Sequence, residues 1–183
     1  MMQSDTPSAL VLLFDGVEEM EAIAPIDILR RAEVSVTTAS LQPQETVAGR
    51  NGIKISPDTA IDRVDPQLFD LFVLPGGPGV LELAENQILL DLIKERSSSG
   101  LKNAAICAAP KVFAAAGLLD DRQATSHASV SEDIPNRSTN AVVVDGPVVT
   151  SQGAGTATQF ALELAAILTN QKTANAVARS IHA

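Results

Sequence analysis

Residues 103–110 read NAAICAAP: a short apolar run ends at the only cysteine, and a proline then opens a segment of helix-forming residues. This order is typical of a buried strand, a tight turn and the start of a helix. At such a turn a thiol lies beside the unpaired N–H groups and the positive dipole end of the helix, which favour the thiolate. Cys107 is therefore a candidate nucleophile. The same pattern fits a buried cysteine that acts only as a small apolar side chain, and the local sequence does not decide between the two.

Apolar runs alternate with helical patterns along the rest of the chain. Besides the strand before Cys107, the runs predict strands at 9–14, 34–39 and 70–74, and helical spacing predicts helices at 18–31, 87–96, 111–116, 156–168 and 173–181. Strands that alternate with helices pair in parallel through right-handed crossovers. We therefore expect an α/β fold, a flavodoxin-like doubly wound, mostly parallel sheet with helices on both faces.

Local signals refine this arrangement. Pro25 falls within the first helical segment, so we expect a short first turn and then a main helix, with Pro25 near its start or at a kink. Asn-Gly and Asp-Gly pairs predict hairpins at 48–55 and 141–150. With no linker or repeat in the sequence, we expect a flexible leader at 1–8 and a single domain over 9–183.

Composition limits the classes of partner and location. The formal net charge is -9 and no basic run interrupts the acidic background, which argues against nucleic acid and anionic membranes as partners. No apolar stretch approaches the roughly 20 residues that cross a bilayer. A single cysteine forms no internal disulfide and the first residues lack the features of a secretory signal, so a cytoplasmic location is expected. One cysteine and two distant histidines offer no metal-ligand spacing, and we expect no metal.

Three segments follow predicted strands and are expected to meet in one cleft: 15–21, 75–79 and 107–110. In doubly wound sheets ligands bind beyond the carboxyl ends of the strands. Of the acids Glu18, Glu19 and Glu21, one that turns inward would face Cys107, and its carboxyl would stay protonated and donate a hydrogen bond to sulfur. Alternatively, these acids complement a helix N-terminus from solvent, which we favour for Glu18 and Glu19.

Other candidates come from the loops. His127 could return to the cleft as a general base, although a lone histidine is more often a surface or core residue, and His182 is discounted as terminal.

The run GGPG at 76–79 lacks the Lys-Ser/Thr ending of a phosphate loop, so we expect no nucleotide cofactor. Its N–H groups, with that of Ala108, could instead donate to an oxyanion near sulfur. The run GAGT at 153–156 is interpreted as a turn and helix cap.

These motifs together resemble the ThiJ/PfpI superfamily, and within it the branch of the Parkinson-associated protein deglycase and its bacterial relatives. The resemblance spans about residues 8–179 and rests on EEME at 18–21, LPGG at 74–77, AICAAP at 105–110, His127 and TSQGAGT at 150–156. It implies a homodimer without cofactor. It also implies roles for Cys107 as nucleophile and oxidation-sensitive thiol, Glu21 as its protonated partner, His127 as the nearby histidine, the amides of Gly76, Gly77 and Ala108 as oxyanion donors, and Arg31 and Arg50 near the site or the dimer interface.

Two departures from the superfamily pattern bear on activity. Protease-like members place a histidine directly after the cysteine, where this chain has Ala108, so peptidase activity is disfavoured. His127 is followed by Ala128, where close relatives often have proline. The resemblance implies a cysteine-dependent, glutathione-independent glyoxalase or deglycase that acts on small dicarbonyls such as methylglyoxal and glyoxal. The alternative from another class is a redox sensor or stress chaperone that operates through oxidation of Cys107.

Overall fold

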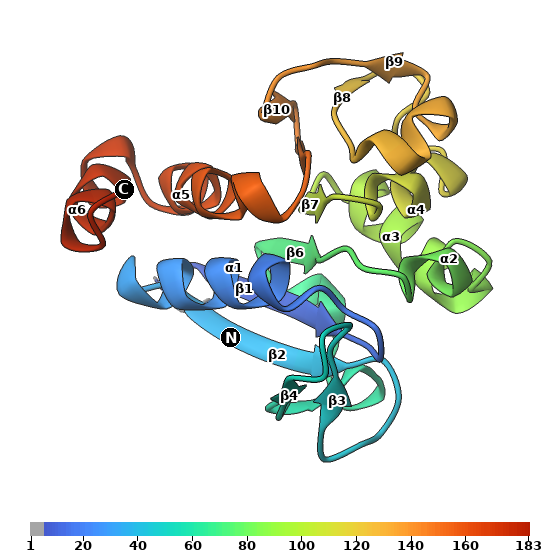
Figure 1. Ribbon diagram of the computed structural model, residues 1–183, viewed down its shortest axis with the longest axis horizontal. Helices are drawn as coiled ribbons and strands as arrows, with labels where there is room; N and C mark the ends of the chain where they lie inside the picture. The colour runs from blue at the N-terminus through green and yellow to red at the C-terminus, as the bar shows by residue number, and fades with distance from the viewer. Residues whose placement is uncertain (1–5) are drawn as a thin grey trace.

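A seven-stranded sheet forms the centre of the computed structural model, which describes residues 6–183 (Figure 1). The strand order is β10-β11-β7-β6-β1-β2-β5, and every pair is parallel except β10 with β11. The strands are β1 (Ser8–Leu13), β2 (Ser35–Ser40), β5 (Thr59–Ala60), β6 (Leu71–Leu74), β7 (Lys102–Ile106), β10 (Val142–Asp145) and β11 (Val148–Ser151). The predicted flavodoxin-like, doubly wound sheet is confirmed.

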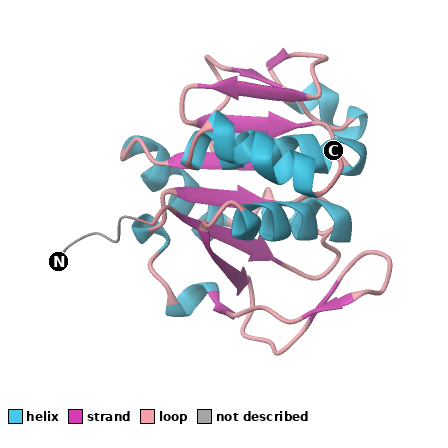
Figure 2. Cartoon of the chain, turned by 90° about the vertical axis from the view of Figure 1, so that its left-hand side faces the viewer, coloured by secondary structure: helices cyan, strands magenta, loops and turns pink. Residues whose placement is uncertain are grey.

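Helices cover both faces of the sheet. One face carries α1 (Glu19–Arg31), α5 (Ala157–Leu168) and α6 (Gln171–Ser180), and Figure 2 looks onto this face; the other carries α2 (Val80–Leu83), α3 (Gln87–Ser98) and α4 (Pro110–Ala115). Side chains alternate across β1, so that Leu10 and Leu12 pack toward α3 and α4 while Ala9 and Val11 pack toward α1 and α5. β1 therefore contributes to two apolar cores, one on each side of the sheet.

Two small ribbons lie outside the main sheet. The predicted hairpin is present as β3 (Val47–Ala48) and β4 (Lys54–Ile55), an antiparallel pair, while β8 (Gln123–Ala124) pairs in parallel with β9 (Asn136–Arg137). Short 3-10 segments lie at Ile61–Arg63, Pro66–Leu68, Ala128–Asp133 and Ala154–Thr156. The sequence patterns did not predict β5, β8, β9 or α2, because two to four residues are too few to show a period.

Two expectations about the N-terminal part need adjustment. Pro25 lies inside α1, which runs through it as one helix rather than starting near it. The buried face that includes Ile28 and Leu29 packs against the neighbouring α5, and this tertiary packing offsets the lost backbone hydrogen bond. The leader expected at residues 1–8 falls mostly on residues 1–5, outside the described part of the chain, and β1 already begins at Ser8.

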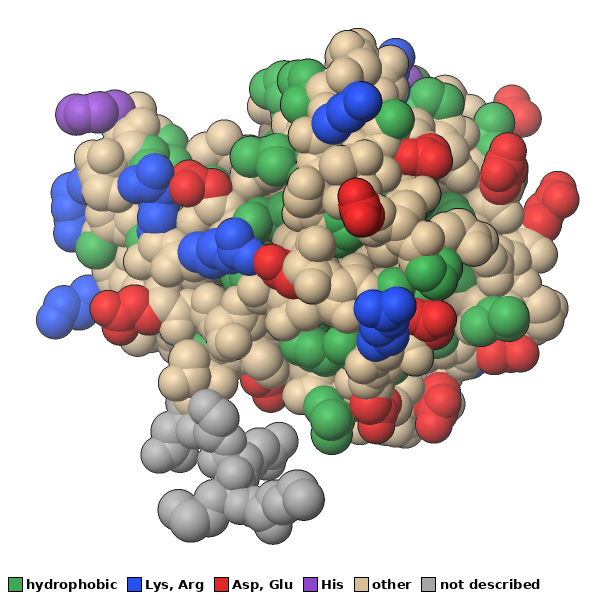
Figure 3. Space-filling view, turned by 90° about the horizontal axis from the view of Figure 1, so that it is seen from below, with side chains coloured by type: hydrophobic (Ala, Val, Ile, Leu, Met, Phe, Trp, Pro, Cys, Tyr) green, Lys and Arg blue, Asp and Glu red, His purple; other side chains and the backbone are tan. Residues whose placement is uncertain are grey.

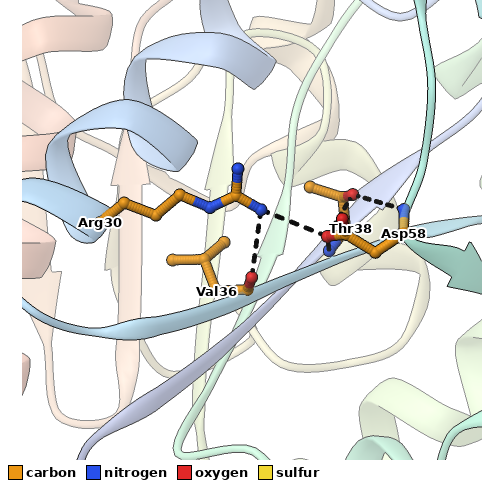
Figure 4. Close-up of polar contacts among 4 residues, drawn as sticks. All are labelled: Arg30, Val36, Thr38 and Asp58. Carbon is orange, nitrogen blue, oxygen red and sulfur yellow. Dashed lines mark hydrogen bonds and ion pairs between the residues drawn. The ribbon is translucent and has the colours of Figure 1, made fainter.

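Polar contacts tie the edge of the sheet to α1. The backbone N–H and the hydroxyl of Thr38 each donate to Asp58 Oδ2 at 2.8 Å, and the Asp58 N–H donates to Thr38 Oγ1 at 2.9 Å (Figure 4). Arg30 Nη2 donates to the same carboxylate oxygen and to the Val36 carbonyl, both at 3.3 Å. These contacts hold the segment that leads from the β3–β4 hairpin into β5.

The surface carries charges of both signs. On the face drawn in Figure 3, acidic and basic side chains are interspersed among apolar and neutral ones. No helix within residues 6–183 combines the length and apolarity that a membrane crossing requires. The expectation that nucleic acid and membranes are not partners stays a prediction.

Arg96 is a fully buried cation that binds carbonyl groups rather than a carboxylate. It donates to the carbonyls of Pro66, Phe69 and Lys102 and to Asn103 Oδ1, and its guanidinium lies 5.9 Å from the centre of the Phe72 ring. Burial lowers the pKa of Arg96 to about 10, and the nearby Asp70 opposes this shift. The side chain therefore remains charged at neutral pH and joins α3 to the segment before β6.

Arg96→Met is expected to lower the free energy of unfolding by roughly 3 kcal/mol, because the apolar side chain leaves buried carbonyl groups without donors. Urea denaturation measures the change, and the exposed Arg63→Met serves as control with an expected change below about 0.5 kcal/mol. Equal stabilities for the two variants would show that the carbonyl contacts of Arg96 do not stabilise the fold.

Candidate active site

The three segments predicted to share a cleft are in contact at the carboxyl ends of β1, β6 and β7. The Glu18 N–H donates to the Gly76 carbonyl at 2.9 Å, and the Gly76 N–H donates to Glu21 Oε2 at 3.0 Å. Space at this junction is small: a Cβ on Gly76 would lie 2.5 Å from Glu21 Oε2 and 2.6 Å from Cys107 Cβ. The absence of a side chain at Gly76 is what lets the acid and the cysteine come together.

Cys107 lies in a sharp turn directly after β7. Its φ is +66°, in the left-handed region that residues other than glycine rarely adopt. Two backbone bonds hold the turn, from the Cys107 N–H to the Ser151 carbonyl at 2.9 Å and from the His127 N–H to the Cys107 carbonyl at 2.8 Å. The residue is half-buried and lines a cavity, so it is not the fully buried side chain of the apolar alternative, and its reactivity stays a prediction.

Glu21 presents its carboxyl to the Cys107 thiol from the first turn of α1. The two side chains are hydrogen-bonded, and Glu21 is 1% exposed. Burial raises the pKa of Glu21 to about 7, with a further contribution from the negative charge of Glu18, while the bonds from Cys107 and the Gly76 amide and the positive charge of Arg50 oppose the rise. The carboxyl therefore exchanges a proton near neutral pH.

The thiol is less acidic than the sequence indicates. Burial, together with the charge and hydrogen bond of Glu21, raises the pKa of Cys107 to about 12, while the amides of Ala108 and Gly77 oppose the rise. The expected effect of the adjacent amides is thus present, but desolvation and the neighbouring acid outweigh it. Because the two groups are coupled, we treat them as one pair that holds at least one proton at neutral pH.

The expected oxyanion donors divide into two roles. The N–H groups of Gly77 and Ala108 hydrogen-bond to the Cys107 sulfur, and their role as oxyanion donors stays a prediction. The N–H of Gly76 instead donates to Glu21, so Gly76 positions the acid and is not an oxyanion donor in this arrangement. Gly77 has φ +116°, and a Cβ there would lie 2.3 Å from the Gly16 carbonyl oxygen, so the turn needs glycine at this position.

His127 lines the same cavity as Cys107. Its Nδ1 accepts the Ser129 N–H at 3.1 Å and lies 2.8 Å from Ser129 Oγ, so His127 caps the following 3-10 segment. A cavity of about 350 Å³ opens beside the cysteine and is lined by Arg50, Gly77, Pro78, Leu81, Cys107, Ala108, His127, Ser129 and Val130. The sequence predicted His127 as a neighbour of the cleft but not its contact with Ser129.

Gly153 marks the point where the polar side chains converge. A Cβ on this residue would lie 3.7 Å from Glu21 Oε1, 3.8 Å from His127 Cδ2 and 3.9 Å from Cys107 Sγ. The sequence interpretation assigned this stretch only a turn and a helix cap. The cap is present through Thr156, whose Oγ1 accepts the Gly153 N–H at 3.1 Å, but Gly153 also leaves open space beside all three side chains.

The two arginines occupy different places. Arg50 lines the cavity, and its backbone N–H donates to the Val17 carbonyl at 2.9 Å. Arg31 lies at the opposite end of α1 from Glu21, where its Nε donates to Asp27 Oδ2 at 2.7 Å, and it lines a separate hollow beside α6. The structure therefore does not place Arg31 at the site, and its part in a dimer interface stays a prediction.

Glu18 and Glu19 differ from the expectation that they face solvent. Both are buried: Glu18 Oε2 accepts the Glu21 N–H at 2.9 Å and caps α1, as the helix interpretation requires. Glu19 accepts the N–H and the side-chain amide of Asn51 at 2.7 and 2.9 Å and so attaches the hairpin to α1. Burial raises the pKa of Glu19, but hydrogen bonds, including those from Asn51 and Ile53, outweigh burial and lower it overall.

No group of three or more His, Cys, Asp or Glu side chains within residues 6–183 is arranged to hold a metal ion. The groups that the structure brings together at the site are a thiol, a carboxyl that titrates near neutrality, an imidazole and two N–H donors at sulfur.

Comparison with known proteins gives consistent matches over most of the chain. The model of the DJ-1/PfpI family matches residues 7–167. The chain is 40% identical over 179 residues to "Protein dj-1beta" of Drosophila melanogaster, covering 95% of this chain and 96% of the relative. It is 35% identical to "Glutathione-independent glyoxalase DJR-1.2" of Caenorhabditis elegans, with 95% of each covered, and 34% identical to "Deglycase TK1284" of Thermococcus kodakarensis, with 80% and 90% covered.

Solved structures match equally well. The crystal structure of Drosophila melanogaster DJ-1beta has a TM-score of 0.91 at 39% identity, covering 96% of this chain and 97% of that one. A structure of oxidised Toxoplasma gondii DJ-1 has a TM-score of 0.91 at 31% identity, covering 96% and 98%. The similarity therefore extends over the whole sheet and both helical layers.

Glu21→Gln is expected to change how stability depends on pH. The raised pKa of Glu21 means that its contribution to stability is complete below the unfolded value of 4.5 and is lost as pH rises through about 7. Relative to the variant, the wild type should thus lose about 3 kcal/mol over this interval. Urea denaturation at a series of pH values measures the difference.

Glu19→Gln is the matched control, since Glu19 is also buried but has a lowered pKa. Here the sign reverses: relative to Glu19→Gln, the wild type should gain stability as pH rises from acid toward neutral. The same pH trend for both variants would contradict the opposite shifts that their surroundings impose.

Proposed function

Because the chain belongs to the DJ-1/PfpI family, we propose that it is a cysteine-dependent, glutathione-independent enzyme that converts small dicarbonyls, or their early adducts, to 2-hydroxy acids. Methylglyoxal and glyoxal are the proposed substrates. One observation carries the proposal: the Cys107 thiol is hydrogen-bonded to a buried carboxyl, Glu21, whose pKa is about 7. The similarity to proteins named as a glyoxalase and a deglycase supports it.

The first step is addition of Cys107 to the aldehyde. The Sγ–C1 bond forms, the electron pair of the carbonyl moves to its oxygen, and the thiol proton passes through Glu21 to that oxygen, which gives a hemithioacetal. The negative charge that develops on oxygen is stabilised by N–H groups, and those of Gly77 and Ala108 already lie at the sulfur. The high pKa of the free thiol is overcome at this step because Glu21 takes its proton as the bond forms.

The second step moves hydrogen between the two carbons. Glu21 removes the C1 hydrogen as a proton and returns it to C2, and the proton of the C1 hydroxyl passes to the C2 oxygen. An enediol lies between the two transfers, after which C2 carries a hydroxyl and C1 is a thioester carbonyl. Water then hydrolyses the thioester and releases the 2-hydroxy acid and the free thiol. C1 is oxidised and C2 reduced within one molecule, and the net reaction adds one water, so no external redox partner is needed.

A carboxyl suits this role when its pKa lies close to the working pH, because it must both accept and return a proton. Glu21 meets this condition through burial, and the Gly76 amide holds it against the thiol. Deglycase activity on early adducts of amines and thiols would start from the same hemithioacetal-like state and use the same groups.

The second candidate function is a redox sensor or stress chaperone that operates through oxidation of Cys107. The N–H groups at sulfur and the hydrogen-bonding carboxyl would also stabilise a sulfinate. The similarity to a DJ-1 solved in oxidised form favours keeping this candidate.

The homodimer, the cytoplasmic location and the single domain over 9–183 also remain proposals. For the homodimer, support comes from an apolar hollow between α1 and α5 that includes Met20, Ile23 and Ile53, whose side chains are 60%, 45% and 58% exposed. Large apolar side chains exposed together in one patch, here two from α1 and Ile53 from the β3–β4 hairpin, are typical of a surface that another chain covers. A second copy of this chain is the occupant that the family resemblance implies.

Purified protein is expected to convert methylglyoxal to lactate without glutathione, and Cys107→Ala is expected to abolish the conversion. Glu21→Gln should lower kcat by about 10²- to 10⁴-fold, because the amide cannot carry the proton. Lactate is measured directly, and Glu19→Gln serves as the control for a buried glutamate outside the reaction. Lactate production that survives Cys107→Ala would exclude the proposed enzyme.

Mild peroxide tests the second candidate by intact mass. A protected sensor should gain two oxygen atoms at Cys107 and stop there, because the carboxyl and the amides hold the sulfinate. Cys107→Ala should gain none under the same conditions. Continued oxidation of the wild type to the sulfonate would count against a sensor state.

A further inference from the structure

We propose that Ser129 is a positioning residue that holds His127 with its ring proton on Nε2, so that the neutral histidine presents an N–H donor to the site. The Ser129 N–H donates to His127 Nδ1 at 3.1 Å, and Ser129 Oγ lies 2.8 Å from the same atom. The catalytic consequence of this tautomer rests on the proposed function. The tautomer itself, in the free protein, does not depend on that function.

The tautomer follows from the kind of donor involved. A backbone N–H can only donate, so Nδ1 must carry a lone pair wherever this bond exists. A neutral imidazole has one N–H, which must then be on Nε2. The Ser129 hydroxyl, facing an atom that can only accept, donates its hydrogen to Nδ1 as well.

The opposite edge of the ring faces the reacting groups. A Cβ placed on Gly153 would lie 3.8 Å from His127 Cδ2, 3.9 Å from Cys107 Sγ and 3.7 Å from Glu21 Oε1. In the imidazole ring, Cδ2 is bonded to Nε2. With Nδ1 directed to Ser129, Nε2 is the ring nitrogen on the side of the cysteine. His127 therefore donates a hydrogen bond to the substrate oxygen, and the base of the reaction is Glu21 rather than His127.

This differs from the general base that the sequence predicts for His127. A base would need a lone pair on the nitrogen nearest the cysteine, and that lone pair is on Nδ1 instead. The segment that fixes the ring is itself anchored to the nucleophile, because the His127 N–H donates to the Cys107 carbonyl at 2.8 Å.

Nitrogen NMR of the free protein tests the ring state without any substrate. His127 should show a protonated Nε2 and an unprotonated Nδ1, and Ser129→Ala should shift the Nδ1 resonance. Ser131→Ala is the matched control, because the Ser131 hydroxyl binds the Ala128 carbonyl at 2.9 Å and not the ring. A proton on Nδ1, or an Nδ1 resonance that ignores Ser129→Ala, overturns the proposal.

Activity tests the consequence. His127→Gln keeps an N–H donor near the Nε2 position and should retain kcat within about tenfold of wild type, whereas His127→Ala should lose clearly more. As a single substitution, Ser129→Ala should lower kcat about fivefold and leave KM nearly unchanged. Added to His127→Ala, it should cause no further change in kcat.

Equal losses in His127→Gln and His127→Ala, or an effect of Ser129→Ala that persists without the imidazole, would overturn the positioning role. If the wild type makes no hydroxy acid at all, the proposed function fails, while the NMR measurement still decides the ring state.

Discussion

The hydrogen bond between the Glu21 carboxyl and the Cys107 thiol is the contact on which the site depends. It joins the first turn of α1 to the turn after β7, and the Gly76 amide from the loop after β6 fixes the carboxyl between them. Each group changes the protonation of the other, because burial makes two adjacent negative charges unfavourable. The pair therefore keeps a proton at neutral pH, and that proton can move to and from a substrate.

The parallel sheet makes this contact possible. Neighbouring parallel strands end at the same edge, so β1, β6 and β7 deliver an acid, a glycine loop and a cysteine to one place. Glycine at positions 76 and 77 then permits an approach that any side chain would block. The Cys107 backbone takes up a left-handed φ, and bonds to Ser151 and His127 hold it there. Strain at the nucleophile is thus supported by two neighbouring segments.

Much of this arrangement could be predicted because the strands and helices carry strong periodic signals. The buried runs at β1, β6 and β7, the two hairpins and the convergence of three loops follow from apolar pattern and from the rule for parallel sheets. The two-residue strands β5, β8 and β9 could not be predicted, because pairing partners far along the chain create them.

The site was less predictable, since burial and electrostatics depend on tertiary contacts. Three neighbouring acids look alike in sequence, yet Glu18 caps α1, Glu19 binds the hairpin and Glu21 faces the thiol. The helix end suggested an acidic thiol, but only the structure shows the burial that makes the pKa rise. Arg31 shares α1 with Glu21 but lies at its far end, a distance of roughly 15 Å along a helix.

Infrared spectroscopy of Glu21 tests the shared proton most directly. The difference spectrum between wild type and Glu21→Gln isolates the carboxyl stretch, which can be followed through neutral pH. A protonated carboxyl band that persists well above 4.5 and titrates near pH 7 is expected from the burial of Glu21 and its contact with Cys107. A carboxylate that is fully ionised at about pH 5, close to the ordinary value for glutamate, would contradict the shared proton and the catalytic role built on it.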